Sequence, residues 1–325
     1  MLKKIKIGLA GTNLEIEKYL KGIKTTEHFD IIGTFDTSVE KNFEIFYSIN
    51  PFYDFLDRAD AIFFCGNQHL NYFQLIQICI KKGKDLLIEK IPEFSYAEWS
   101  VLQKLNHEAR SVFFISNIKG NCCQFIASKS LAAKPNFVKS KINLQFGKPQ
   151  SNSELKDIVK ENIDIVVRCV QSNIKKVKIN QFFVFNQKPE KPDEIKISIL
   201  FENSTNAEII INRMAEKKEN TLTFYQLGKI IKTDFESFKI EEIRLNHSQN
   251  TSINLFNENQ NNTNISPSFQ KTEKNIIYFD VIQKDLVNFV DCFINRVSPL
   301  VSLDEAIEVN YVLQNIAYVY EEIFI

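Results

Sequence analysis

Short apolar segments alternate with helical ones through the first third of the chain, and this alternation constrains the fold more than any other feature. Five segments are strand-like and almost continuously apolar: 4–10, 29–35, 61–65, 85–89 and 111–115. Helices are predicted between them at 14–23, 70–82 and 96–109. Strands without a polar face need cover on both sides, and helical crossovers provide it. The first third is therefore predicted to be a doubly wound α/β domain with a parallel sheet.

The alternation of strands and helices ends after about residue 118. A long helix is predicted at 154–170, and strand-like segments joined by short polar turns follow it at 177–185, 194–201, 205–211, 222–225 and 229–233. Consecutive strands without helical spacers predict a mostly antiparallel sheet. The tract 246–266 is rich in Asn, Gln and Ser and reads as an exposed loop. Two helices with apolar stripes end the chain.

A chain of 325 residues is long for a single core, so two domains are expected. We place a nucleotide-binding type of domain at 1–118 and an α+β domain at 119–325. The C-terminal helices, within 279–325, could pack back on the first domain.

Charge and cysteine content exclude several classes of protein. Forty basic residues balance forty acidic ones, so no basic field is available for nucleic acid or an anionic membrane. No apolar run approaches the roughly 20 residues of a membrane span, and the basic start lacks a signal-peptide core, so a cytoplasmic location is expected. The six cysteines show no C-x-x-C spacing, which favours buried thiols and predicts no structural metal.

The turn after the first strand carries the candidate cofactor site. Dinucleotide-binding folds have G-x-G-x-x-G there, for a tight turn, close approach of phosphates and close helix packing. Here Gly11 is retained, Asn13 and Ile16 replace the other two glycines, and Glu15 adds a carboxylate near the helix start. Asp36 follows the second strand, where an acid binds ribose hydroxyls. Because Thr37 and Ser38 supply no cation for a 2′-phosphate, NAD is favoured over NADP.

Three segments in the expected order resemble the Gfo/Idh/MocA family of NAD(P)-dependent sugar oxidoreductases. The strand and helix of 61–90, ending in Glu89-Lys90-Ile91-Pro92, are similar to the family segment that ends in Glu-Lys-Pro. The helix at 157–166 resembles the family's Asp-x-x-x-His-x-x-Asp helix, and 283–306 resembles its last two helices. The resemblance implies an N-terminal Rossmann domain, a second domain with a mostly antiparallel sheet, and a homodimer or higher homo-oligomer.

The resemblance also implies the roles of several residues. Lys90 would contact the nicotinamide and the substrate hydroxyl, with Glu89 and His69 beside it in the cofactor site. Asp157 and Glu161 would bind substrate, but Glu161 stands where the family has its proton-accepting His. A carboxylate can act as a base, although its usual pKa of about 4 makes it a weak one.

Two functions remain open on these residues. The first is an NAD(P)-dependent oxidoreductase acting on a sugar-like or other small hydroxy or carbonyl substrate, with an eroded active site. The second is a catalytically inactive relative that keeps the fold as a binding or assembly module, since loss of site residues usually costs no stability.

Overall fold

A computed structural model describes residues 4–36, 49–66, 72–116, 122–132, 134–145, 152–182, 193–246, 268–275, 280–299 and 303–324. The chain forms two compact units. Unit 1 comprises 1–122, 152–168 and 279–325, and unit 2 comprises 123–151 and 169–278. The domain boundary expected between residues 118 and 119 stays a prediction, although this grouping shows that the units are not consecutive pieces of the chain.

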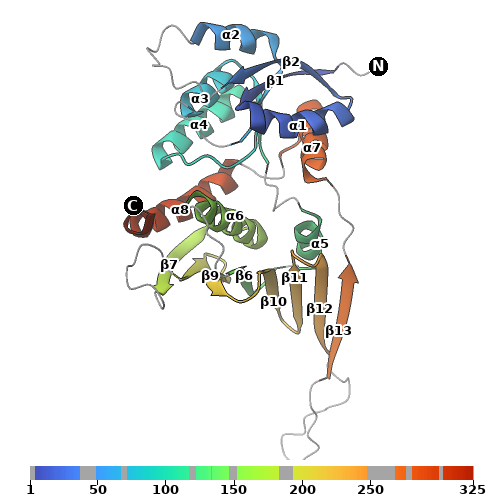
Figure 1. Cartoon of the computed structure of the whole chain (residues 1–325), viewed down its shortest axis with the longest axis vertical. Coiled ribbons are helices and arrows are strands. Elements are labelled where there is room, and N and C mark those ends of the chain that lie inside the picture. Colours follow the sequence, from blue (N-terminus) through green and yellow to red (C-terminus); the bar gives the residue numbers. More distant parts are fainter. Residues whose placement is uncertain are drawn as a thin grey trace, which may run out of the picture. The chain divides into compact units, whose positions relative to one another are not determined.

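Unit 1 contains a parallel sheet of five strands in the order β2-β1-β3-β4-β5. Its strands are β1 (Ile5–Gly11), β2 (Phe29–Asp36), β3 (Ala61–Phe64), β4 (Asp85–Ile88) and β5 (Phe113–Ile115). Figure 1 labels its strands β1 and β2. All residues of β3, β4 and β5 are buried, as expected for strands covered on both faces. The predicted parallel α/β sheet is confirmed.

Helices α1 (Asn13–Thr25), α2 (Ile49–Arg58), α3 (Tyr72–Lys81) and α8 (Leu303–Phe324) contact this sheet. Unit 1 also contains α4 (Tyr96–Ala109), α7 (Val281–Asn295) and most of α6 (Asn152–Val170). A capping box, Ser95 with Glu98, begins α4, and Asp280 caps α7. Within unit 1, α1 packs against α7, and α4 packs against α8. The sequence did not predict α2.

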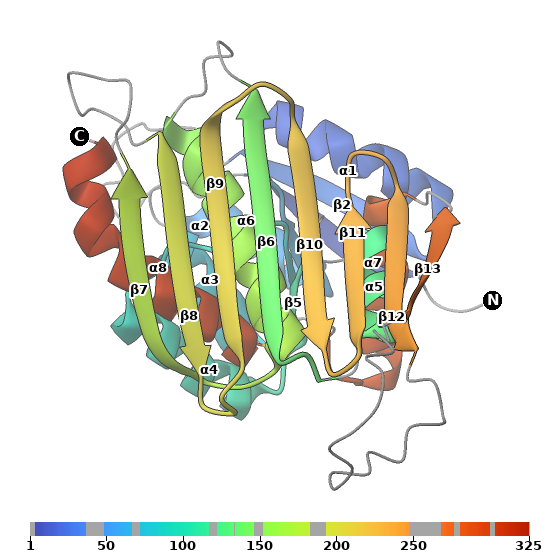
Figure 2. The same ribbon diagram turned by 90° about the horizontal axis from the view of Figure 1, so that it is seen from below.

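Unit 2 is built on an eight-stranded sheet in the order β13-β12-β11-β10-β6-β9-β8-β7 (Figure 2). Its strands are β6 (Phe137–Gln145), β7 (Ile174–Phe182), β8 (Glu194–Phe201), β9 (Asn206–Ala215), β10 (Glu219–Gln226), β11 (Lys229–Asp234), β12 (Lys239–Asn246) and β13 (Ser268–Asn275). Every pairing is antiparallel except that of β6 with β9. The mostly antiparallel sheet is therefore confirmed. Of the tract 246–266 that was predicted as a loop, Asn246 ends β12 and the rest lies outside the described residues.

The two faces of the second sheet differ in polarity. Residues alternate between buried and part-exposed along β6 and β8, and the buried set of β8 is Ile195, Ile197, Ile199 and Phe201. The short helix α5 (Cys123–Leu131) contacts β11 and β12 and lies behind them in Figure 2. We call the face opposite to α5 the outer face.

The part of the chain that the structure describes shows neither a membrane-spanning helix nor a cluster of metal ligands. No helix there is long and apolar enough to span a membrane. The same residues include no group of three or more His, Cys, Asp or Glu side chains arranged to hold a metal ion. Five of the six cysteines are buried and Cys122 is part-exposed.

Candidate functional site

The candidate site lies where β4 ends, at the edge of the sheet formed by the carboxyl ends of the strands. Ligands bind at this edge in open parallel sheets. Here the structure forms a pocket within unit 1, lined by Glu89, Lys90, Ile91, Ser116, Asp157, Lys160, Glu161 and Asp164. Four residues predicted from the sequence, which are Glu89, Lys90, Asp157 and Glu161, are thus brought together. They come from two elements more than 60 residues apart in the chain.

An ion pair joins these two elements. The Nζ atom of Lys90 donates a hydrogen bond to Oδ2 of Asp157 over 3.0 Å. The side chains are 39% and 42% exposed, so water screens the attraction and its contribution to stability is small. The pair holds an ammonium group and a carboxylate in the lining of the pocket, where both can hydrogen-bond a hydroxylated ligand.

The polar face of α6 supplies the opposite wall. Asp157, Lys160, Glu161 and Asp164 are spaced i, i+3, i+4 and i+7, which places them on one face of the helix. The buried apolar set of the same helix is Leu155, Val159, Ile163, Val166 and Val167. Sequence reasoning recognised the two aspartates and Glu161 and missed Lys160, although the same helical spacing could have identified it.

Lys160 is the more buried of the two pocket lysines. Its side chain is 13% exposed, and its Nζ lies 3.8 Å from Oε1 of Glu93. Burial disfavours the charged ammonium and lowers the pKa of Lys160 below its usual range, while the nearby carboxylates of Glu93 and Asp157 oppose that shift. The positive charge of Lys90 adds to the lowering. Amines with a lowered pKa are suited to proton transfer.

Buried polar groups support the pocket from beneath. Oε2 of Glu89 accepts the backbone N–H of Gly66, which joins the ends of β3 and β4. The hydroxyl of Ser116 donates to the carboxylate of Asp285 on α7. Burial, together with the nearby negative charge of Glu89, raises the pKa of the Tyr19 hydroxyl well above its usual value. Glu89 therefore organises the strand ends at the pocket floor.

The first turn of α1 shows why Gly11 is present. A Cβ atom on Gly11 would lie 2.5 Å from the carbonyl oxygen of Cys65, so only glycine fits where β1 and β3 converge. Ile16, at the position of the third motif glycine, is 3% exposed and belongs to the hydrophobic core under α1. This core role accounts for both residues without reference to a ligand.

The geometry of this turn fits the phosphates of a dinucleotide. The carbonyl of Thr12 accepts the N–H of Ile16 over 3.0 Å, so α1 starts directly after β1, and the first N–H groups have no acceptor within the helix. Thr12 and Glu15 also have the residue types of a capping box, which satisfies such groups internally. A backbone turn of this kind can bind the phosphates of a nucleotide.

The remaining predicted cofactor residues are described in part or not at all. Asn13 is the first residue of α1, and Asp36, the last residue of β2, pairs in register with Gly11. The side chains of Asn13 and Asp36 are not among the described ones. His69 lies outside the described residues.

A parallel Rossmann-type sheet with a pocket at its carboxyl edge, together with a second, mostly antiparallel sheet, is the architecture of Gfo/Idh/MocA-type dehydrogenases. The predicted resemblance is confirmed at the level of the fold. No protein-family model matches the sequence, and no curated protein matches it.

Solved structures supply the particular likenesses. The chain is similar to UDP-N-acetylglucosamine 3-dehydrogenase GnnA from Acidithiobacillus ferrooxidans, with a TM-score of 0.75, 15% identity and 96% of each chain covered. It is similar to the dehydrogenase MviM from Clostridium difficile, with a TM-score of 0.70, 15% identity and coverage of 98% of this chain and 100% of that one. Biliverdin reductase from Synechocystis, solved with biliverdin and NADP+, matches with a TM-score of 0.68, 14% identity and coverage of 97% and 98%. At these identities the likeness establishes the fold.

Proposed function

We propose that this protein is an NAD(P)-dependent oxidoreductase acting on a sugar-like or other small hydroxy or carbonyl substrate. The observation that supports it best is the pocket at the carboxyl edge of the parallel sheet, where two lysines face several carboxylates. Ammonium groups donate and carboxylates accept hydrogen bonds, a combination that suits a ligand with several hydroxyl groups. Similar folds include the sugar-nucleotide dehydrogenase GnnA.

The cofactor would be held by the first turn of α1 and the end of β2. Gly11, Asn13 and the first N–H groups of α1 would bind the phosphates, and Asp36 would bind the ribose hydroxyls, with NAD favoured over NADP. His69 would lie near the nicotinamide, and Glu89 would keep the strand ends in place. The bound nicotinamide would supply the hydride acceptor or donor.

The substrate would be held by the groups that line the pocket. Lys90 would donate a hydrogen bond to the reacting oxygen, and Asp157 and Glu161 would accept hydrogen bonds from neighbouring hydroxyls. Asp157 would also keep the Lys90 ammonium in position through their ion pair. We further propose a cytoplasmic homodimer, or a higher homo-oligomer, with no nucleic-acid or membrane partner.

A fluorescence titration with NADH and NADPH tests the proposal. We expect saturable binding below about 1 mM, within the range usual for enzyme substrates. Asp36→Ala is expected to weaken NADH binding about tenfold or more, because a charge-assisted hydrogen bond is lost. Lys104→Met, on the exposed face of α4, is the matched control and should leave binding unchanged.

A catalytically inactive relative is the second candidate. The observations that favour it are the core position of Ile16 and the capping-box residue types of Thr12 and Glu15, since both let the first turn of α1 stand without a ligand. Absence of NADH and NADPH binding at millimolar concentration would contradict the oxidoreductase and leave this candidate.

A further inference from the structure

We propose that Lys160 is the proton-exchanging residue of this pocket, taking the role that the resemblance assigned to position 161. Its amine would accept the proton of a substrate hydroxyl during oxidation and return a proton to the carbonyl oxygen during reduction. The inference rests on the proposed function, since it presumes a substrate that is oxidised or reduced in this pocket.

The position of Lys160 on α6 supports this role. Lys160 and Glu161 both line the pocket, on the polar face that starts with Asp157 and ends with Asp164. Moving by one residue along this face keeps a side chain directed at the same pocket, because i+3 and i+4 lie on the same side of a helix. A lysine at 160 can therefore replace a proton-transfer group at 161.

The two lysines of the pocket have different surroundings. Lys90 is three times as exposed as Lys160, at 39% against 13%, and its Nζ is hydrogen-bonded to Asp157. The nearest carboxylate to Lys160 in the described contacts, Glu93, lies at 3.8 Å, beyond a hydrogen bond. Lys90 thus suits a fixed donor, and Lys160 suits a group that gains and loses a proton.

The charges around Lys160 tune this exchange. Glu93 approaches from the segment after β4, Lys90 from the end of β4, and Asp157 and Asp164 from α6 itself. Glu89 and Glu161 complete the ionisable lining of the pocket. Burial favours the neutral amine while the carboxylates of Glu93, Asp157 and Asp164 favour the ammonium, so both protonation states are accessible.

Oxidation of a substrate hydroxyl in this pocket would transfer one hydride and one proton. In the oxidation direction the carbon loses its C–H bond and the electron pair leaves as hydride to the oxidised dinucleotide. The O–H proton passes to the neutral amine of Lys160, which becomes an ammonium, and the C–O bond becomes C=O. Reduction runs through the same transfers in reverse.

The first test measures Lys160 itself, without cofactor or substrate. Lysine ε-carbons are labelled with 13C in the full-length protein and titrated by NMR, and Lys160→Arg identifies the signal of Lys160. We expect this amine to titrate at lower pH than the other lysines. Glu93→Gln should lower its midpoint further, because a neighbouring negative charge is removed. Titration together with the exposed lysines would overturn the proposal.

The second test measures turnover with NAD+ and each of three probes: myo-inositol, D-glucose and UDP-N-acetylglucosamine. Lys160→Met is expected to lower kcat about 10²–10⁴-fold, the usual contribution of a general acid or base. Lys160→Arg should not restore it, since a guanidinium does not release its proton. Lys104→Met is the control, and circular dichroism checks the fold of each variant.

The outcomes separate the two proposals. Wild-type protein that binds no dinucleotide contradicts the oxidoreductase and the role of Lys160 with it. Turnover by Lys160→Met within about threefold of wild type contradicts the role of Lys160 alone. If Lys160→Met does not fold, the pH profile of Glu93→Gln for oxidation decides, because its acidic limb should shift with the Lys160 midpoint. If no probe is turned over, the NMR titration decides.

Discussion

At the scale of single residues, the turn after β1 has a structural explanation that its motif did not predict. Gly11 is required by the carbonyl of Cys65, 2.5 Å from where its Cβ would lie. Ile16 is buried in the core formed by α1, β1 and α7, with neighbours such as Leu286 and Phe289. Ile16 thus departs from G-x-G-x-x-G because its side chain packs in the core. Asn13 is the departure at the position where we expect the phosphates to bind.

Substitution of Ile16 tests this assignment. Ile16→Gly is expected to lower the free energy of unfolding by about 3–5 kcal/mol, because it empties a core position and adds a helix-disfavouring residue. Ile16→Val should cost only about 0.5–1.5 kcal/mol. Urea unfolding followed by circular dichroism measures both. Equal, small effects would mean that Ile16 does not belong to the core.

Substitution of Asn13 is expected to change cofactor binding and to leave stability nearly unchanged. Asn13→Gly removes a side chain next to the helix N-terminus, so we expect tighter NADH binding with little change in stability. Fluorescence titration of wild type and variant measures the affinity. Unchanged or weaker binding would count against phosphates at this turn.

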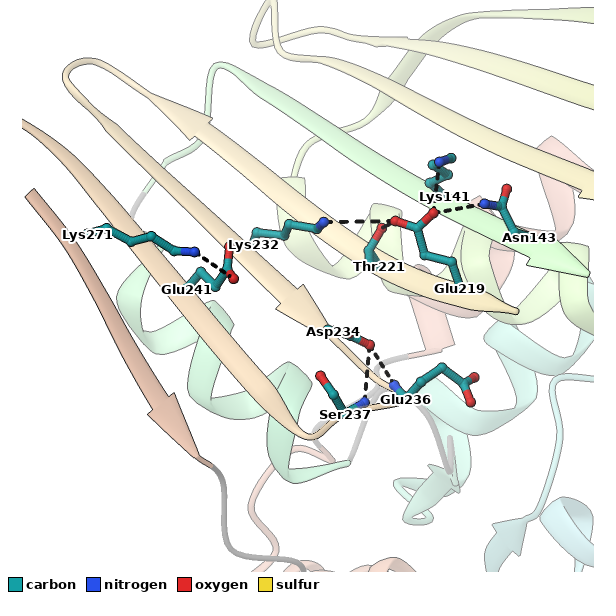
Figure 3. A network of polar contacts seen from close by, with 10 residues as sticks. All are labelled: Lys141, Asn143, Glu219, Thr221, Lys232, Asp234, Glu236, Ser237, Glu241 and Lys271. Carbon is teal, nitrogen blue, oxygen red and sulfur yellow. Dashed lines mark hydrogen bonds and ion pairs between the residues drawn. The ribbon is translucent and has the colours of Figure 1, made fainter. Parts of the chain in front are cut away.

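At the scale of elements, charged side chains on the second sheet favour its strand register and link it to α5. On the outer face, Glu219 of β10 accepts from Lys141 and Asn143 of β6, each over 2.8 Å, and Lys232 of β11 lies 3.9 Å away on its other side (Figure 3). These cross-strand contacts favour the observed register. Asp234 closes the turn between β11 and β12 by accepting two backbone N–H groups, also seen in Figure 3.

Glu242 belongs to the opposite face, against α5. Its Oε1 accepts from Nε of Arg244 at 2.6 Å and lies 3.1 Å from Nζ of Lys229, which in turn donates to the carbonyl of Leu131 at the end of α5. Burial alone would raise the pKa of Glu242, but the hydrogen bonds from Arg244 and Lys229 outweigh it and hold the pKa below its usual value. The carboxylate thus links β11, β12 and α5.

This link predicts a dependence of stability on pH. A carboxylate whose pKa is lowered by folding contributes stability above its unfolded pKa, about 4.3, and loses it as the pH falls through the folded value. Glu242→Gln should cost about 1–3 kcal/mol at pH 7, and its difference from wild type should shrink below about pH 4. Urea unfolding at pH 7, 4 and 3 measures this.

Glu241→Gln is the matched control for that experiment. Glu241 precedes Glu242 on β12 and pairs with Lys271 at 3.0 Å, with side chains 31% and 49% exposed. An exposed pair contributes about 0–1 kcal/mol, so the control should lie close to wild type at every pH. A pH-independent cost for Glu242→Gln would contradict the linkage.

At the scale of the whole molecule, the outer face of the second sheet is the surface through which we expect two copies to pair. Ile210 of β9 lies on this face, in register with Lys141 of β6 and Lys196 of β8. Ile210→Glu is expected to convert a dimer to a monomer, because the carboxylate and the two lysines beside it would lose their hydration at the interface. Light scattering after size-exclusion chromatography measures the mass.

Ile210→Glu should disrupt the pairing without disrupting the fold of the single chain. A glutamate at 210 would lie between two lysines of its own chain, so the monomer should fold normally. Leu227→Glu, at a fully exposed position with 99% of its surface accessible, should leave the dimer intact. A wild-type protein that is already monomeric would refute the pairing.

The sequence by itself determined most of the local elements and the order of the two types of sheet along the chain. Apolar strands separated by helices predicted the parallel sheet, and consecutive strands predicted the second sheet, because both patterns repeat over a few residues. The sequence also identified Lys90, Asp157 and Glu161 as candidates. It did not reveal α2, α5, β6, β12 or β13. The helical periodicity of α5 is weak, and β13 consists mostly of polar residues.

Only the tertiary structure decided which residues meet. The approach of α6 to the end of β4 joins Lys90 to Asp157 across 67 positions of the chain, and it buries Lys160 beside them. The tertiary structure also explains why position 11 must be glycine, because the carbonyl of Cys65, directly after β3, leaves no room for a Cβ atom. Periodicity reports the face on which a side chain lies, whereas burial and electrostatic environment depend on segments distant in sequence, and these set the chemistry of the pocket.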